Sequence, residues 1–191
     1  MSIPSEDIAI YPPPDGRGLS LIADPELRRL AKYWASKRNG RPVPSRADID
    51  PIDIPWALPH FFLIDYDRDT GTYRYRIAGG DVETIFQSAT GSHSMRGVAL
   101  RDMLKPDAAA LVEKRWQPLA DRGDIVYMSG MVYLPAERIP KGERVLLPLS
   151  DRDDFQTTGL IGMTKCTWLP FSGTAPEVSL NIHYIPLGEI P

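Results

Sequence analysis

Alternating apolar and polar positions predict a strand at residues 73–78. Tyr73, Tyr75 and Ile77 occupy every second position, with Arg74 and Arg76 between them, which is the period of a strand with one buried face. We favour the register that buries the three apolar side chains, because burying aromatic rings is more favourable than burying two unpaired cations. In the opposite register the arginines would point into a pocket and select an anionic ligand.

The residues that follow this strand predict a turn and a short helix. Gly79 and Gly80 interrupt the strand, and Asp81 is a candidate N-cap. Apolar residues then recur at helical spacing, at Val82, Ile85 and Phe86. We expect the helix to lie over the sheet, so that the strand, the turn and the helix form one wall of a pocket.

A second amphipathic helix is predicted over residues 25–38. An N-cap at Asp24 followed by Pro25 begins it, and the Asn-Gly pair at residues 39–40 ends it. Its apolar face carries Leu27, Leu30 and Trp34. We expect these three residues to form a homodimer interface, because Tyr33 beside them widens the apolar stripe enough to meet a second copy as well as the domain.

The rest of the chain predicts an α+β domain. Further strands are expected at residues 61–65, 125–134, 144–149 and 159–167, with a possible sixth at 178–184. A longer helix is expected at residues 106–121. Two strands, a helical middle and three more strands indicate a five-stranded antiparallel sheet with helices on one face, together with the N-terminal helix and a C-terminal extension.

We divide the chain into four segments. They are an extended arm at 1–23, a helix and proline-rich strap at 24–58, the core at 59–168, and a C-terminal extension with the possible extra strand at 169–191. The prolines of the strap prevent a long helix or a central strand. Its charged residues Arg46, Asp48, Asp50 and Asp53 are interpreted as turn caps and ion-pair partners, because their spacing matches no known metal-binding loop.

Composition and charge argue against several classes of function. The net charge of -3 is spread along the chain, so nucleic acid and membrane surfaces are not expected partners. With no signal peptide and no apolar run long enough to span a membrane, we expect a cytoplasmic protein. Cys166 is the single cysteine, which rules out an internal disulfide and is interpreted as a small buried residue.

No residues stand out as catalytic or metal-binding. The three histidines, His60, His93 and His183, do not have the spacing of a metal site. The run GGDVE at residues 79–83 superficially resembles the signature of diguanylate cyclases, yet its last residues continue with helical spacing, and a helix start is the simpler interpretation. We therefore predict neither an enzyme nor a metal site.

The order of predicted elements resembles that of a PAS domain. The amino-acid sequence also resembles a family of short bacterial proteins, frequent in proteobacteria, that contain little besides one PAS domain. This resemblance rests on YW at residues 33–34, PSRADIDP at 44–51, YRYRIAG at 73–79 and GERVLLPL at 142–149. It covers residues 24–167.

The resemblance implies a ligand between the sheet and the helices at 81–87 and 106–121. The residues we expect to contact it are Tyr75, Ile77, Val82, Phe86, Leu104, Trp116, Tyr127 and Met131. A flavin photosensor of this class needs a cysteine after the second strand, and residues 81–95 contain none. A haem-binding member usually offers a histidine from the long helix, which has none here, so the cofactor stays unknown.

PAS domains as a class sense small molecules, light or redox state, form dimers and relay the change to a partner. We therefore expect a non-enzymatic sensory or regulatory protein that binds a small ligand, forms a homodimer and signals through a partner protein. One alternative is a ligand-free PAS module that acts only through protein contacts. A small cofactor-free enzyme is the third class considered.

Overall fold

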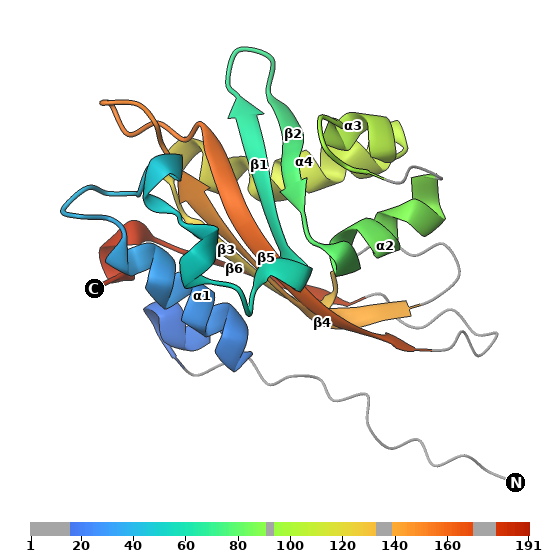
Figure 1. Cartoon of the computed structure of the whole chain (residues 1–191), viewed down its shortest axis with the longest axis horizontal. Coiled ribbons are helices and arrows are strands. Elements are labelled where there is room, and N and C mark those ends of the chain that lie inside the picture. The colour runs from blue at the N-terminus through green and yellow to red at the C-terminus, as the bar shows by residue number, and fades with distance from the viewer. Residues whose placement is uncertain (1–15, 91–93, 133–138, 170–178) are drawn as a thin grey trace, which may run out of the picture.

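The structure is a single antiparallel sheet with helices on both faces. The computed structural model describes residues 16–90, 94–132, 139–169 and 179–191. Its strands are β1 (Phe61–Asp67), β2 (Thr72–Ala78), β3 (Ile125–Met131), β4 (Ile139–Leu149), β5 (Gly159–Leu169) and β6 (Leu180–Ile185). They pair in the order β2-β1-β5-β4-β3-β6 (Figure 1). The predicted α+β plan is confirmed, and the possible sixth strand is real, since β6 pairs with β3.

Three helices cover one face of the sheet. They are α2 (Gly80–Thr90), α3 (Leu100–Met103) and α4 (Pro106–Arg122). Pro106 occupies the first turn of α4, and Gly123 ends it with φ 72°, a left-handed conformation that glycine adopts without strain. We call the apolar layer beneath them the helix-covered core. Its buried members include Phe62, Ile64, Tyr73, Tyr75, Val82, Met95, Leu100, Trp116, Leu119, Val126, Met128, Leu146 and Leu160.

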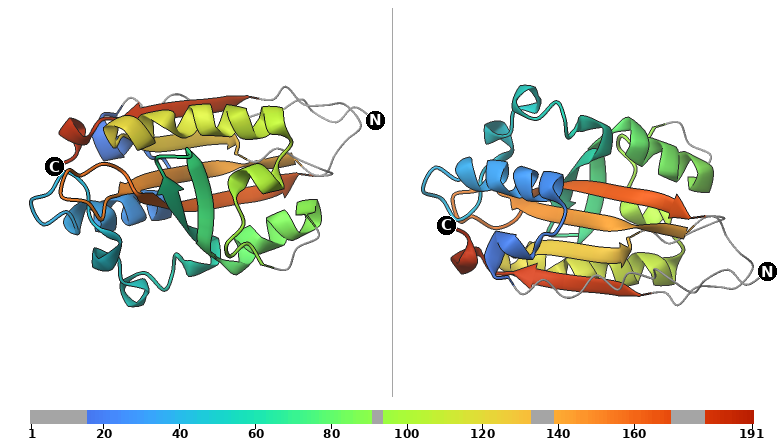
Figure 2. Two further views of the ribbon diagram at one scale, coloured as in Figure 1. Left: turned by 90° about the horizontal axis from the view of Figure 1, so that it is seen from above. Right: turned by 90° about the horizontal axis from the view of Figure 1, so that it is seen from below.

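The N-terminal helix α1 (Pro25–Ser36) covers the opposite face, as the two views of Figure 2 show. Asp24 caps it as predicted, because its side chain accepts hydrogen bonds from the Glu26 and Leu27 amides. Leu27, Leu30 and Trp34 are fully buried against the sheet. Trp34 also donates from Nε1 to the Pro148 carbonyl at 2.7 Å.

This placement corrects the expected dimer interface. Leu27, Leu30 and Trp34 are 0% exposed within one chain, so a second copy cannot contact them while α1 stays packed. The apolar stripe of α1 looked wide enough to contact both the domain and a second copy. Periodicity along a helix does not reveal how much of such a stripe the sheet of the same chain covers. Association of two copies itself stays a prediction.

A proline-rich strap links α1 to the sheet through three short 3-10 turns. Ser45 and Asp48 form a reciprocal capping box at the first turn, and Asp50 caps the second through the Ile52 amide. Asp48 also pairs with Arg41, and Lys37 pairs with Asp53 at 2.8 Å. These contacts confirm that the strap carboxylates serve as turn caps and ion-pair partners. Part of the segment expected to be an extended arm, residues 1–23, also packs on this face of the sheet, since Leu19 and Ile22 are buried in the core beneath α1.

A bulge in the first hairpin changes the predicted register of β2. Ile64 lies opposite Tyr75 and Leu63 opposite Ile77, so Arg76 is an extra residue between them. Tyr73 and Tyr75 are buried, as predicted. Ile77, however, leaves their face and lies on the α1 side with Leu63, because one inserted residue reverses the alternation.

The glycine pair after β2 has two different tasks. At Gly79 an added Cβ would lie 2.0 Å from the Leu58 carbonyl oxygen, so only glycine allows this close approach of two backbones. At Gly80 nothing lies within 4 Å of an added Cβ. The helix begins at Gly80, so Asp81 lies in the first turn of α2 and does not cap it from outside.

Candidate functional site

Five of the eight predicted ligand contacts gather in the helix-covered core. Tyr75, Val82 and Trp116 are buried there, and Phe86 and Leu104 are half-buried against them. They come from β2, α2, α4 and the chain after α3. Their clustering agrees with the predicted wall of strand, turn and helix; the ligand contact itself stays a prediction.

The other three residues lie elsewhere. Ile77 is on the α1 side of the sheet and 46% exposed, because of the bulge in β2. Tyr127 belongs to the core beneath α1, because β3 alternates and its neighbours Val126 and Met128 take the helix-covered face. Met131, at the end of β3, is half-buried and belongs to neither core. We correct the placement of all three accordingly.

Aromatic rings dominate the helix-covered core. Tyr73 meets Trp116 edge-on, with ring centroids 5.2 Å apart, and stacks on Tyr66 at 4.5 Å. The ring centroid of Tyr75 lies 6.0 Å from that of Phe62 and 6.1 Å from that of Phe86. An ideal Cβ at Gly162 would lie 2.3 Å from the Phe62 ring, so this glycine makes room for the aromatic layer.

Two polar atoms are buried in this apolar layer without a hydrogen-bond partner among the described residues. They are the hydroxyl of Tyr73 and the indole Nε1 of Trp116. Burial raises the pKa of Tyr73 well above its ordinary value, so its hydroxyl stays a neutral donor. Native proteins pair almost all such groups with protein, water or ligand atoms. These two donors are therefore polar atoms within an otherwise apolar core.

A buried arginine on the same face escaped the sequence analysis. Arg144 is 8% exposed, and its Nε donates to the buried Thr164 hydroxyl at 2.8 Å. Its guanidinium carbon lies 5.9 Å from the centre of the Phe62 ring. The signal was present in the alternation of β4, because Arg144 shares its face with Leu146. That run was used to predict a strand and a family resemblance, and the side on which Arg144 lies was not considered.

Cys166 lies at the edge of the same core, half-buried. Burial raises the pKa of its thiol, and the nearby charges of Arg144 and Asp81 act in opposite directions. The thiol therefore stays protonated near neutral pH. This agrees with its interpretation as a small packing residue.

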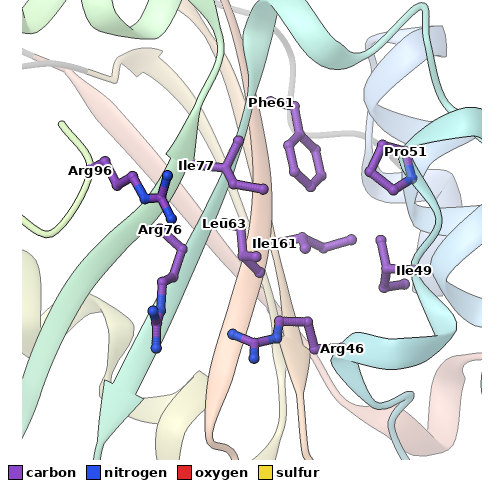
Figure 3. Close-up of a pocket in the computed structure, with 9 residues that line it drawn as sticks. All are labelled: Arg46, Ile49, Pro51, Phe61, Leu63, Arg76, Ile77, Arg96 and Ile161. Carbon is purple, nitrogen blue, oxygen red and sulfur yellow. The ribbon is translucent and has the colours of Figure 1, made fainter. Parts of the chain in front are cut away.

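A second site lies on the opposite face, between the sheet and the strap. It is a pocket of about 450 Å³, which we call the arginine groove (Figure 3). Its lining residues are Arg46, Ile49, Pro51, Phe61, Leu63, Arg76, Ile77, Arg96 and Ile161. Apolar side chains lie between arginines that come from the strap, from β2 and from the loop before α3. The sequence analysis considered Arg76 with Arg74 and considered Arg46 with the strap carboxylates, and it did not bring Arg46, Arg76 and Arg96 together.

The histidines and the helices of the described part of the chain bear on metal ligation and on membrane-spanning segments. Within those residues no three histidine, cysteine or acidic side chains gather as metal ligands would. His60 pairs with Asp81 at 3.0 Å, and His183 stacks on Tyr127. His93 lies outside the described residues. None of the helices described here has the length and apolar content to cross a bilayer.

Comparison with known proteins identifies one family. A PAS domain matches residues 22–163, well over half of the 191-residue chain. Comparison with curated proteins and with solved structures gives no significant match. The matched span runs from the segment before α1 to the middle of β5 and so includes both faces of the sheet. This chain belongs to the PAS domain family, whose members serve as sensory, regulatory or interaction modules.

Proposed function

We propose that this chain is a non-enzymatic PAS sensory or regulatory protein of the cytoplasm that binds a small ligand in the helix-covered core. The observation that carries the proposal is the pair of buried donors, the Tyr73 hydroxyl and Trp116 Nε1, which have no partner among the described residues. A buried donor left unpaired costs about 1–3 kcal/mol. Acceptor atoms on a bound ligand would remove that cost for both donors.

The surroundings of the two donors indicate what kind of molecule would bind. Aromatic rings from Tyr75, Phe86 and Phe62 supply apolar contacts. Arg144 and Thr164 add a second polar region on the same face of the sheet. A compact ligand with an apolar body and at least one hydrogen-bond acceptor would suit these surroundings.

The proposed output is a change in association with a partner protein or a second copy. α2 and the four-residue α3 form much of the cover over the core, and short helices are held mainly by their packing. A ligand that binds better to one packing of these helices shifts the population toward it. The altered outer surface of the helices would then be what the partner recognises.

A second candidate function is a PAS interaction module that binds no ligand. The dense aromatic packing of Tyr66, Tyr73, Trp116, Phe62 and Tyr75 favours it, because these side chains already fill much of the space beneath the helices. In that case an ordered water would satisfy the two donors.

Mass spectrometry of the purified protein separates the two candidates. The protein is denatured, and the small molecules released are compared among wild type, Tyr73→Phe and Tyr66→Phe. Both substitutions remove one hydroxyl from the stacked ring pair, but only that of Tyr73 is a buried atom without a partner. We expect a compound in stoichiometric amount from wild type and Tyr66→Phe, and much less from Tyr73→Phe.

One result would count against ligand sensing, and another against a role for the Tyr73 hydroxyl in it. Wild type that releases no compound, and that shows no thermal shift with any member of a metabolite library, would favour the interaction module. Equal release from wild type and Tyr73→Phe would show that a ligand exists but does not use this donor.

A further inference from the structure

We propose that the arginine groove is a second binding site, for a small organic acid with an apolar body and one carboxylate. The proposal does not depend on a ligand in the helix-covered core, which lies on the other face of the sheet. The groove has a volume of about 450 Å³, within the range of small-molecule sites. Its chemistry is that of a basic rim above an apolar floor.

The floor has apolar surface that the described residues leave exposed. Ile77 is 46% exposed, although it lies in a strand next to Leu63. The bulge in β2 is the cause, since it turns both Arg76 and Ile77 toward the strap. Bulges commonly redirect side chains beside functional sites. Here it places an apolar contact and a cation next to each other.

The rim already holds a carboxylate between two arginines. Asp65 accepts from Arg46 at 3.1 Å and from Arg76 on its other oxygen. The guanidinium groups are therefore placed to bind carboxylate oxygens, which they do with directed, charge-assisted hydrogen bonds. Asp151 also lies at the rim, where its Oδ1 accepts from the Arg46 amide at 2.9 Å. Two aspartates do not neutralise three arginines, so the rim keeps an excess of positive charge.

Arg96 supplies that excess. No ion pair with an acidic side chain is found for it among the described residues, and its side chain is exposed. The loop that carries it is fixed along the edge of β2, where the Gly97 amide donates to the Tyr75 carbonyl at 2.7 Å and the Tyr75 amide donates to the Val98 carbonyl at 3.0 Å. Arg96 is thus held beside Arg76 by the backbone (Figure 3).

Nearby acidic residues of the strap do not cancel this charge by pointing into the groove. Asp48 pairs with Arg41, Asp53 pairs with Lys37, and Asp50 accepts from the Ile52 amide. A bound acid would place its carboxylate at Arg96, where it gains a charge-assisted hydrogen bond, and its apolar body on Ile77 and Ile161.

Octanoate tests the proposal, with 1-octanol as its uncharged counterpart of equal chain length. Each is titrated into the full chain and followed by two-dimensional ¹H–¹⁵N NMR. The variants are Arg96→Gln and, as a control with the same change in charge, Lys114→Gln on the exposed side of α4. Circular dichroism checks that both variants are folded.

We expect octanoate to shift signals of groove residues and to bind about tenfold more weakly to Arg96→Gln than to wild type or Lys114→Gln. Octanol should bind about as weakly as octanoate does to Arg96→Gln. Higher salt should weaken octanoate binding and leave octanol unaffected. Ile77→Glu, which brings a carboxylate of the chain itself into the groove, should abolish octanoate binding.

Three results would overturn the proposal. They are no octanoate binding by wild type at millimolar concentration, equal affinities of Arg96→Gln and Lys114→Gln, and shifts confined to the helix-covered core. The last would place the acid in the other site.

Discussion

Tyr73 and Tyr127 are both buried in the sheet, yet their hydroxyl groups have opposite surroundings. The Tyr127 hydroxyl donates to Glu143 Oε2 at 2.7 Å and accepts from the Ala23 amide at 3.3 Å. Glu143 Oε2 also accepts from the Asp24 amide at 2.8 Å, so this buried group ties the start of α1 to the sheet. The Tyr73 hydroxyl has no such partner among the described residues.

Removing each hydroxyl should therefore have different effects on stability. We expect Tyr127→Phe to lower the free energy of unfolding by about 1–2 kcal/mol, because it breaks a hydrogen bond to a buried carboxylate. In ligand-free protein, Tyr73→Phe should leave it unchanged or raise it by up to about 1 kcal/mol, because it removes an unpaired polar atom. Urea unfolding measures both. Equal losses would mean that a water or ligand pairs with Tyr73.

A surface ion pair gives a pH-dependent prediction at the same scale. The hydrogen bond from Lys165 lowers the pKa of Glu26, and the same contact raises the pKa of Lys165. Because the folded pKa of Glu26 is depressed, the stabilisation is present at neutral pH and is lost as pH falls through the folded pKa. Both side chains are partly exposed, so we expect at most about 0.5 kcal/mol.

NMR titration of the Glu26 carboxyl group tests this pair directly. In Lys165→Gln its pKa should rise toward the ordinary glutamate value. The stability difference between wild type and Glu26→Gln should shrink as the pH falls below the ordinary glutamate pKa and through the lowered pKa of Glu26. An unchanged Glu26 pKa in Lys165→Gln would mean that the two side chains do not pair in solution.

At the scale of elements, the junction between β2 and α2 depends on one glycine of an adjacent pair. Gly79 approaches the carbonyls of Leu58 and Pro59, where an added Cβ would lie 2.0 and 2.4 Å from their oxygens. Its amide also donates to the Phe61 carbonyl at 2.8 Å. Gly80, in the first turn of α2, has open space around it.

The two glycines should respond differently to alanine. Gly79→Ala should lower the free energy of unfolding by about 2 kcal/mol or more, because backbone atoms of the strap must move. Gly80→Ala should be neutral or stabilise by up to about 1 kcal/mol, since alanine favours the helix. Chemical unfolding of both variants is the measurement. Similar losses at both positions would contradict the role assigned to Gly79.

At the scale of the whole molecule, the sheet separates two layers with different contents. α2, α3 and α4 cover one face (Figure 1). Beneath them lie the two buried donors without a partner among the described residues. α1 and the strap cover the other face, and the strap lines the arginine groove. Because α1 is part of this second layer, its apolar stripe holds the chain together.

Leu30→Ala tests that role. We expect a loss of about 2–4 kcal/mol in the free energy of unfolding, because the side chain is fully buried. Lys32→Ala on the exposed side of α1 should change it by less than about 0.5 kcal/mol. The sedimentation mass should be the same for wild type and both variants. A lower mass for Leu30→Ala with little loss of stability would restore the predicted dimer interface.

The sequence by itself determined the elements, their order and the family. The local spacing of apolar residues predicts helices and strands. Residues such as Asp24, Pro106 and Gly123 mark where helices begin and end. Together with the family resemblance, these patterns correctly placed Tyr75, Val82 and Trp116 in one core. These features depend on residues close together in the chain, and a single sequence contains that information.

Only the tertiary structure decided which surfaces remain available. The bulge that moves Ile77 to the other face, and the burial of Leu27, Leu30 and Trp34 by the chain's own sheet, both arise from pairing between distant segments. The groove joins Arg46, Arg76 and Arg96 from three separate segments. Such contacts follow from which faces meet in the folded chain, and periodicity along one segment does not specify its partner.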